Sequence, residues 1–328
     1  MRALKRTTKS NSYVCMSDRV LVSQTRPQSK YDLAVVGHIV LDRISRGNRQ
    51  YDTQMGSPCV YSSLGARALN ASVVVASKVG LDFGIERLAW LRSRGVDIDY
   101  VRYSNSLTTS FIIRYENACR FMWVASKCAP LTDRDLSDIP SSSALHIGPI
   151  LGEISQSLAM SLTDRNSVTC LDPQGYLRRI LGNGAIRKSK WRNRALLRHL
   201  DVLKVSEDEA SALIGRTKSS LKLCALGPGI VLITRGKAGT FVWSRDHGTY
   251  VVPAYKTRVR DPTGAGDALV GAFLVTWVHT GDLPWSVAIG SAVASFVVER
   301  VGPTNFGTPK QVEKRAKTIF DGIVRMHE

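Results

Sequence analysis

The feature that most constrains this chain is a regular alternation of short, apolar, β-branched runs with segments of helical periodicity. Short apolar runs predict strands buried on both faces, and strands that alternate with helices predict a mostly parallel sheet covered by helices. The predicted strands are residues 33–36, 72–76, 144–147, 168–171, 202–205 and 230–233. The predicted helices are residues 60–69, 84–94, 154–163, 207–213, 267–280 and 286–300.

One segment breaks this alternation. Residues 108–124 have the pattern of two strands around a turn at residues 116–118, and residues 100–103 are a candidate third strand. A hairpin inserted into an α/β chain is either a lid over a binding site or an ordinary edge hairpin.

Length and composition agree with an α/β enzyme. The chain has 328 residues and is 44% hydrophobic, which is enough for one large domain with or without a small appendage. No apolar run approaches the ~18 residues that span a bilayer, so we expect no membrane association. The six cysteines show no C-x-x-C pair or metal-site spacing, which predicts reduced thiols in a cytoplasmic protein and no zinc site.

The formal net charge of +18 fits either an enzyme of anionic ligands or a nucleic-acid binder. Residues 1–30 are basic and hydroxyl-rich with one acid, Asp18, which predicts a disordered extension; a transit peptide would have a similar composition. Residues 178–198 form a second basic block, either a solvated helix and loop or a surface that attracts nucleotide or nucleic acid. The lack of a recognisable nucleic-acid-binding module argues against a dedicated nucleic-acid role.

Residues 261–267, Asp-Pro-Thr-Gly-Ala-Gly-Asp, form a Pro/Gly turn directly before a strongly apolar helix. Backbone N–H groups converge at such a helix start, where the helix dipole favours an anion such as phosphate. Asp267 would repel a phosphate that is merely bound there. Asp267 is therefore either a first-turn capping residue or a general base that accepts a proton from a substrate hydroxyl beside an anion hole.

At every position except Pro262, these seven residues resemble the DTTGAGD signature of the ribokinase-like (PfkB) carbohydrate kinases. The resemblance covers about residues 31–310 and implies a three-layer α/β/α fold with a mostly parallel central sheet and a small β lid. It also implies that Asp267 is the catalytic base and that Gly264, Ala265 and Gly266 form the anion hole.

The acceptor side departs from the family pattern. Asp42 follows the first predicted strand, where relatives bind sugar hydroxyls. In the region that resembles the first family signature, Met55 replaces a glycine, and Val60 or Tyr61 stands where sugar kinases often have an asparagine. Gln174 replaces the asparagine of a D-P-N-x-R motif and is either a substrate contact or a turn residue. The resemblance gives Asp42, Gly56, Ser57 and Gln174 as substrate-binding residues and Phe111, Tyr115 and Arg120 as lid contacts.

On the donor side, the resemblance assigns ATP contacts to a strand-end T-x-G element and to the turn before the apolar helix. The implied nucleotide-binding residues are Thr234, Gly236, Asp261 and Thr263. Glu209 occupies the glutamate of the family's N-x-x-E motif, which orders Mg²⁺ through water, although Ser206 replaces the asparagine. Ser206 and Glu209 also have capping-box spacing, and both roles can coexist. Several relatives bind a monovalent cation near the Asp261 turn.

The resemblance implies ATP-dependent phosphorylation of a hydroxyl on a small sugar or polyol. Short strings at residues 56–63, 171–175 and 204–207 look most like the inositol-kinase-like branch, whose acceptor is a cyclitol such as myo-inositol. A nucleoside kinase of the same fold and a non-catalytic sugar or nucleotide sensor remain alternatives. We expect a basic extension at residues 1–30, a kinase domain at 31–310 with a lid hairpin at about 100–125, and a C-terminal helix at 311–328. A homodimer formed through the lid is compatible with the sequence.

Overall fold

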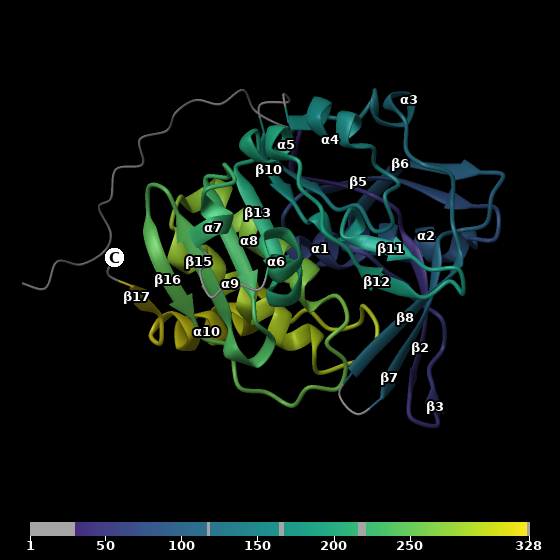
Figure 1. The fold of residues 1–328 in the computed structure, drawn as a ribbon. Helices are drawn as coiled ribbons and strands as arrows, with labels where there is room; N and C mark the ends of the chain where they lie inside the picture. The colour runs from purple at the N-terminus through teal and green to yellow at the C-terminus, as the bar shows by residue number, and fades with distance from the viewer. Residues whose placement is uncertain (1–29, 117–118, 164–166, 216–220, 327–328) are drawn as a thin grey trace, which may run out of the picture.

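The computed structural model describes residues 30–116, 119–163, 167–215 and 221–326, and Figure 1 shows its fold. The predicted basic extension falls outside these residues except for Lys30, as does part of the turn predicted at residues 116–118. A ten-stranded sheet forms the centre of the molecule. Its order is β6 (Val96–Ser104), β5 (Val73–Gly80), β1 (Tyr31–Val36), β9 (Ser142–Ile147), β10 (Val168–Leu171), β13 (Val202–Ser206), β14 (Ile230–Thr234), β15 (Thr240–Ser244), β16 (Gly248–Val252) and β17 (Val324–Met326).

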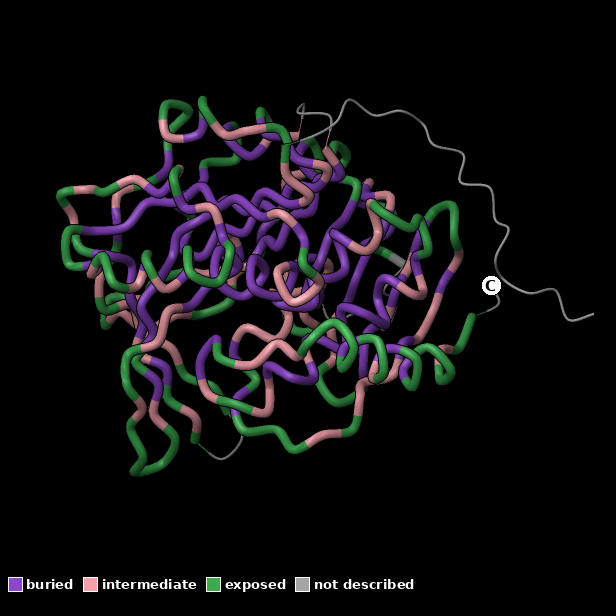
Figure 2. The backbone as a smooth tube through the Cα atoms, turned by 180° about the vertical axis from the view of Figure 1, so that it is seen from behind, coloured by how far each residue is buried: buried purple, intermediate pink, exposed green. Residues whose placement is uncertain are grey.

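Neighbouring strands are parallel from β6 to β14 and antiparallel from β14 to β17. All six predicted strands are present in the parallel part, as β1, β5, β9, β10, β13 and β14. Their apolar residues are buried on both sides because helices cover both faces of the sheet. Figure 2 shows this buried backbone running through the centre of the molecule, with exposed segments at its rim.

The helices divide into two layers. Those on one face are α1 (Pro58–Arg67), α2 (Ile85–Ser93), α8 (Ala265–Thr280), α9 (Leu283–Val297) and α10 (Pro309–Phe320). Those on the other are α3 (Asp133–Leu136), α4 (Gln156–Thr163), α5 (Arg194–Arg198), α6 (Glu207–Ile214) and α7 (Leu221–Cys224). The three-layer α/β/α prediction is confirmed.

Close packing of α1 against α8 fixes the start of α8. A Cβ on Gly271 of α8 would lie only 1.9 Å from the backbone oxygen of Ser62 on α1, so only glycine permits this approach. Residues of α8 from Ala268 to Val275 are buried throughout, which explains why the sequence shows no polar stripe there.

A smaller five-stranded sheet projects from the main body and forms the lid (Figure 1). Its strands are β2 (Val40–Arg46), β3 (Arg49–Gln50), β4 (Gln54–Gly56), β7 (Ser110–Glu116) and β8 (Cys119–Ser126). The antiparallel β7–β8 hairpin is the one predicted at residues 108–124. The candidate third strand at 100–103 was wrong: it belongs to β6, the edge of the main sheet, because Val96, Ile98 and Val101 pack into the main core. Instead, β2 runs parallel to β7 in the lid.

The basic block 178–198 contains a hairpin that the sequence did not indicate. Strands β11 (Arg178–Ile180) and β12 (Ile186–Lys188) pair antiparallel, and α5 follows. The hairpin continues the lid, because the Val124 N–H donates to the Gly184 carbonyl (2.9 Å) and Trp123 forms a bridge with Ala185. At the C-terminus, the expected helix ends at Phe320 and the chain then pairs with β16 as β17.

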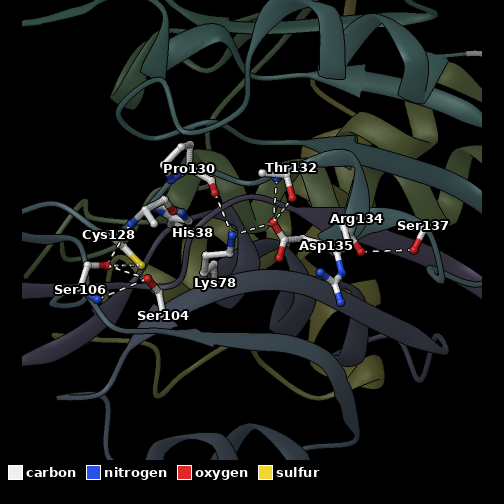
Figure 3. Close-up of polar contacts among 11 residues, drawn as sticks. His38, Lys78, Ser104, Ser106, Cys128, Pro130, Thr132, Arg134, Asp135 and Ser137 are labelled. Atoms are coloured by element: carbon white, nitrogen blue, oxygen red, sulfur yellow. Dashed lines mark hydrogen bonds and ion pairs between the residues drawn. The ribbon is translucent and has the colours of Figure 1, made fainter.

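The chain crosses between the main body and the lid at a cluster of satisfied polar groups around His38 (Figure 3). His38 Nδ1 lies 3.0 Å from Thr109 Oγ1, and Nε2 lies 3.0 Å from the Ala129 carbonyl oxygen. Thr109 Oγ1 accepts the Cys128 N–H (2.9 Å), so its hydroxyl is left to donate to Nδ1 while Nε2–H donates to Ala129. Burial lowers the pKa of His38, which keeps the imidazole neutral. The imidazole therefore ties three connecting segments together.

A buried ion pair lies beside His38 (Figure 3). Lys78 of β5 donates to Asp135 of α3 (2.6 Å) and to the Pro130 carbonyl oxygen (2.9 Å), on the segment that leads out of the lid.

None of the helices described is both long and apolar enough to cross a bilayer. Cys59, Cys119, Cys128 and Cys170 are free thiols.

Candidate active site

Helix α8 begins where the sequence places the anion hole. Its N-cap, Gly264, has φ 77°, and a Cβ there would lie 2.3 Å from the ring of Tyr61. Glycine alone fits both the left-handed backbone and the close ring. The Ala265 N–H already donates to the Pro262 carbonyl (3.3 Å), so it is not available to an anion. Of the three residues predicted to form the anion hole, Gly264 and Gly266 remain candidates.

Asp267 lies in the first turn of α8, and its side chain is 13% exposed. Burial raises the pKa of this carboxyl to about 7, against the opposing charges of Lys204 and Arg178, and the nearby acids Asp172 and Glu209 add to the rise. A carboxyl that gains and loses its proton near neutral pH is suited to general-base catalysis. The environment of Asp267 therefore favours chemistry over simple helix capping.

A small pocket of about 60 Å³ adjoins Asp267. We call it the acceptor pocket because it is lined by three of the predicted substrate-binding residues, Asp42, Ser57 and Gln174. Asp42 and Ser57 line it, and both Asp42 Oδ1 and Ser57 Oγ are buried without a hydrogen-bond partner among the described residues. Ser57 also has φ 95°, an uncommon conformation for a residue other than glycine. Burial raises the pKa of Asp42 to about 6, although Arg120 and Arg178 oppose this. Two orphaned buried oxygens, of which the one on Ser57 sits at a strained backbone position, mark this pocket as a candidate site for a ligand that donates hydrogen bonds.

Asp42 is placed differently from the sequence expectation. It lies within lid strand β2, and not directly after the first strand of the main sheet. Strand β4 pairs with β2, and a Cβ on Gly56 would lie 2.2 Å from Asp42 Oδ2. Gly56 does not line the acceptor pocket; it leaves room for Asp42.

Of Val60 and Tyr61, the two positions predicted to stand where sugar kinases often have an asparagine, only Tyr61 lines the acceptor pocket. Tyr61 is 1% exposed and packs against Gly264 and the main core, and Val60 is buried in the same core. An aromatic ring therefore forms this part of the pocket wall.

The lid reaches the site in two ways. Phe111 and Arg120 line the acceptor pocket, as expected of lid contacts. The Tyr115 hydroxyl donates to Thr263 Oγ1 (2.8 Å), whose own hydroxyl donates to Asp261 Oδ1 (2.7 Å). Tyr115 therefore supports the turn before α8 from the lid and does not itself line the pocket.

Asp261 holds Thr263 in place and lines none of the three spaces of the site. It is 3% exposed, and its Oδ1 accepts both the N–H (3.0 Å) and the hydroxyl of Thr263. Asp261 Oδ2 is buried without a hydrogen-bond partner among the described residues. Thr263, in contrast, lines the acceptor pocket and the larger cavity beside it.

Three of the predicted nucleotide-binding residues, Thr234, Gly236 and Thr263, line two adjoining spaces, which we call the donor side. A cavity of about 1040 Å³ is lined by Thr234, Thr263, Gly264, Gly266 and Asp267, and by residues of β8 and the β11–β12 hairpin. A second pocket of about 510 Å³ lies between α8, α9 and residues 254–259. Thr234 lines both spaces and Gly236 lines the second. Of the two nucleotide-binding residues expected at the end of β14, Thr234 therefore lies where the two spaces meet and Gly236 lies in the second.

Glu209 lines the large cavity and also caps its own helix. The Ser206 N–H donates to Glu209 Oε2 (2.8 Å), and Ser206 Oγ accepts the Glu209 N–H (3.3 Å), which is the predicted capping box. Burial acts to raise the pKa of Glu209, but Lys204 and the bonds from Ser206 outweigh it and lower the pKa, so the carboxylate stays ionised. In the described part of the chain, no three His, Cys, Asp or Glu side chains form a metal cluster. One carboxylate with water and phosphate oxygens is an ordinary Mg²⁺ environment, so Glu209 fits that ion.

Gln174 is both a turn residue and a pocket residue. It lies in the 3₁₀ turn Pro173–Gly175, where its N–H donates to Asp172 Oδ1 (3.2 Å), and it lines the acceptor pocket and the large cavity. Arg178 donates to Gln174 Oε1 (2.6 Å) and to the Ile150 carbonyl oxygen (2.9 Å). Arg178 thereby fixes the orientation of the Gln174 amide at the edge of the acceptor pocket.

Sequence reasoning missed Lys204 and Asp172 as site residues. Lys204 Nζ lies 2.6 Å from Asp172 Oδ2 and 3.9 Å from Asp267 Oδ1. The available signal was a lysine within an otherwise apolar predicted strand, because a buried ammonium requires a carboxylate nearby.

Comparison with known proteins agrees with this geometry. Residues 57–311 match the model of the pfkB family carbohydrate kinases. This chain belongs to the pfkB family. Together with the fold, the match identifies it as a small-molecule kinase of ribokinase type.

Other pfkB relatives act on different acceptors. A nucleoside kinase of Methanothermobacter thermautotrophicus is 26% identical over 311 residues, covering 87% of this chain and 95% of that protein. An inositol 3-kinase of Arabidopsis thaliana is 24% identical over 283 residues, covering 83% and 75%. A solved pyrophosphate-dependent kinase in the ribokinase family superposes with a TM-score of 0.76 at 25% identity, covering 86% of this chain and 99% of that one. These relatives support kinase activity but do not select a substrate or a donor.

Proposed function

We propose that this protein transfers the γ-phosphoryl group of ATP to a hydroxyl of a small polyhydroxylated acceptor, a cyclitol such as myo-inositol. The observation that carries the proposal is the position of Asp267, which lines both the acceptor pocket and the large donor cavity. A general base for phosphoryl transfer must meet the acceptor hydroxyl and the transferring group together.

The second donor-side pocket supports a nucleotide donor. Leu269, Ala294 and Val298 give it an apolar wall, and it shares Thr234 and Gly266 with the phosphate cavity. A flat apolar base fits such a wall, whereas pyrophosphate has no group to place there. This favours ATP over pyrophosphate, the donor on which one structural relative depends.

The acceptor pocket supports a neutral polyol. Asp42 offers a carboxylate to hydroxyl groups, Ser57 offers a hydroxyl, and Tyr61 and Phe111 provide apolar walls against ring C–H groups. The similarity to an inositol 3-kinase agrees with a cyclitol.

In the proposed reaction, Asp267 accepts the proton of the acceptor hydroxyl as that oxygen attacks the γ-phosphorus. The amides of Gly264 and Gly266 stabilise charge on the phosphoryl oxygens, and Asp42 orients the acceptor. Mg²⁺ near Glu209 would supply positive charge to the phosphates.

An ADP-release assay over cyclitols, sugars and nucleosides tests the proposal, with phosphate release from pyrophosphate measured in parallel. We expect turnover of myo-inositol with ATP. A preference for nucleosides would establish the nucleoside kinase alternative, for which the relative from Methanothermobacter is the supporting observation. Turnover with pyrophosphate alone would reject the donor, and no turnover on any acceptor would favour a sensor.

A further inference from the structure

Lys204 is a buried charge in the middle of the main sheet. It lies in β13 between buried Leu203 and Val205, and the whole residue is 6% exposed. An ammonium group in such surroundings is costly unless carboxylates compensate it. The position of Lys204 therefore needs an explanation in its contacts.

Those contacts place Lys204 between two elements of the site. Its Nζ donates to Asp172 Oδ2 (2.6 Å) at the end of β10 and lies 3.9 Å from Asp267 Oδ1 at the start of α8. A Cβ on Gly266 would lie 2.9 Å from the same nitrogen, so the first turn of α8 rests directly on the ammonium group. Asp172 is fixed in turn by the Gln174 N–H.

More acids than cations surround this ammonium. Burial by itself lowers the pKa of Lys204, but the carboxylates outweigh it and raise the pKa, so Lys204 stays charged. Lys204 is the largest of the influences that hold the pKa of Asp267 down against burial. The titratable or charged groups facing Asp267 are Lys204 on β13, Asp172 after β10, Arg178 on β11, Glu209 on α6, and Cys59 and Tyr61 on α1, with Asp42 on β2 and Arg120 on β8 across the acceptor pocket.

We propose that Lys204 is a positioning residue for phosphoryl transfer: anchored by Asp172, it holds Asp267 as a carboxylate aimed at the acceptor hydroxyl. This inference rests on the proposed function. The acceptor O–H bond breaks and its proton goes to Asp267, while a new O–P bond forms and the bond to the donor's bridging oxygen breaks with its electron pair. Lys204 keeps its own protons throughout.

The alternative is a purely structural tie between β13 and β10. Lys78 provides a matched control, because it too is buried in the main sheet and donates to an aspartate at 2.6 Å, yet it lines none of the three spaces of the site. A structural tie predicts that both lysines affect folding alone. A positioning role predicts that only Lys204 affects the pH dependence of catalysis.

The test compares K204M, K204M/D172N, K204R and K78M in the full-length protein, with kcat and kcat/KM measured from pH 5 to 10. We expect the acid limb of kcat in K204M to move up by at least about one pH unit, which is about a tenfold loss at pH 7 for each unit. K204R keeps the positive charge, so the acid limb of its kcat should lie between those of K204M and the wild type. The double variant removes both buried charges, so it should fold if K204M does not and still show a smaller upward shift.

An unshifted acid limb in K204M or the double variant would overturn the proposal, as would an equal shift in K78M. Failure of the proposed function is a separate outcome, in which the wild type turns over no acceptor. In that event, the ¹³C carboxyl resonance of Asp267, assigned with D267N, gives the same answer without turnover. Its titration should move upward in K204M, and an unchanged titration would reject the role of Lys204.

Discussion

Two buried lysine–aspartate pairs in the main sheet have the same length and different surroundings. Lys78–Asp135 and Lys204–Asp172 both measure 2.6 Å, and all four side chains are at most 15% exposed. Asp135 Oδ2, which accepts from Lys78, also accepts the Thr132 N–H (2.8 Å) and hydroxyl (2.7 Å), so three donors meet at this one oxygen. Burial acts to raise the pKa of Asp135, but the bonds from Lys78 and Thr132 outweigh it and the pKa is lowered.

Around the Lys204–Asp172 pair, acidic groups outnumber basic ones. Asp172 is fully buried, and its pKa is raised by burial first and by Glu209, against the opposing charge of Lys204. Two further acids, Glu209 and Asp267, contribute to the raised pKa of the same lysine. The Lys78–Asp135 pair fixes the base of the lid. The cluster around Lys204 contains more acids than bases and lies beside the large cavity, so it sets the pKa of the proposed base, Asp267. The groups around these two ion pairs, and not their N–O distances, therefore distinguish the structural pair from the pair beside the proposed base.

The largest effect should come from removing the base. Asp267→Asn keeps the shape of the side chain but cannot accept a proton, so kcat should fall on the order of 10²–10⁴-fold. Nucleotide affinity, measured by calorimetry, should change little because Asp267 is not expected to contact the base or ribose. An Asp267→Asn protein with wild-type kcat would contradict the assignment.

Breaking the Lys78–Asp135 pair should lower the stability of the fold and leave catalysis unchanged. Lys78→Met leaves Asp135 without its ammonium partner and should lower the free energy of unfolding by about 3 kcal/mol, as expected when a buried pair is broken. Denaturant unfolding measures this change. The kcat of the folded variant should equal that of the wild type, and a loss of kcat without a loss of stability would reverse the comparison.

Asp267 should also destabilise the fold at neutral pH. Its pKa is about 7 in the folded protein against an ordinary value of 3.8, so the folded state binds the proton more tightly and stability falls as pH rises from about 4 to about 7. Asp267→Asn removes this dependence and should be more stable than wild type by roughly 1–3 kcal/mol at pH 8. The gain should vanish near pH 4, as thermal unfolding at several pH values can show; a gain that grows toward acid pH would reject the sign.

The smallest effect should come from the contact between lid and turn. Tyr115→Phe removes the hydrogen bond to Thr263 Oγ1 and should cost about 1 kcal/mol, equivalent to about a fivefold loss in kcat/KM for the acceptor. Arg43→Ala, an exposed change on the neighbouring lid strand β2, serves as the control. Equal effects of the two variants would show that Tyr115 acts only through general lid packing.

Much of the fold followed from local pattern. The six inner parallel strands, the β7–β8 hairpin and the turn before α8 each have a signal within a few residues, because buried strands and glycine-rich helix starts restrict residue type directly. The lid strand β2 gave no such signal, since its partner β7 is far away in the sequence. The β11–β12 hairpin pairs locally, but its strands are three residues long, basic and mostly exposed, so they lack the apolar pattern that marks a strand.

The site divides in the same way. The sequence alone determined that Gly264 and Gly266 begin a helix suited to an anion and that Asp267 stands beside them, because helix-start chemistry is local. Only the tertiary structure decided that Asp42 belongs to the lid, that Asp261 supports Thr263, and that Lys204 meets Asp172 and Asp267. Those contacts join strands and helices far apart in the chain, and the burial that sets the pKa of Asp267 exists only once they have packed together.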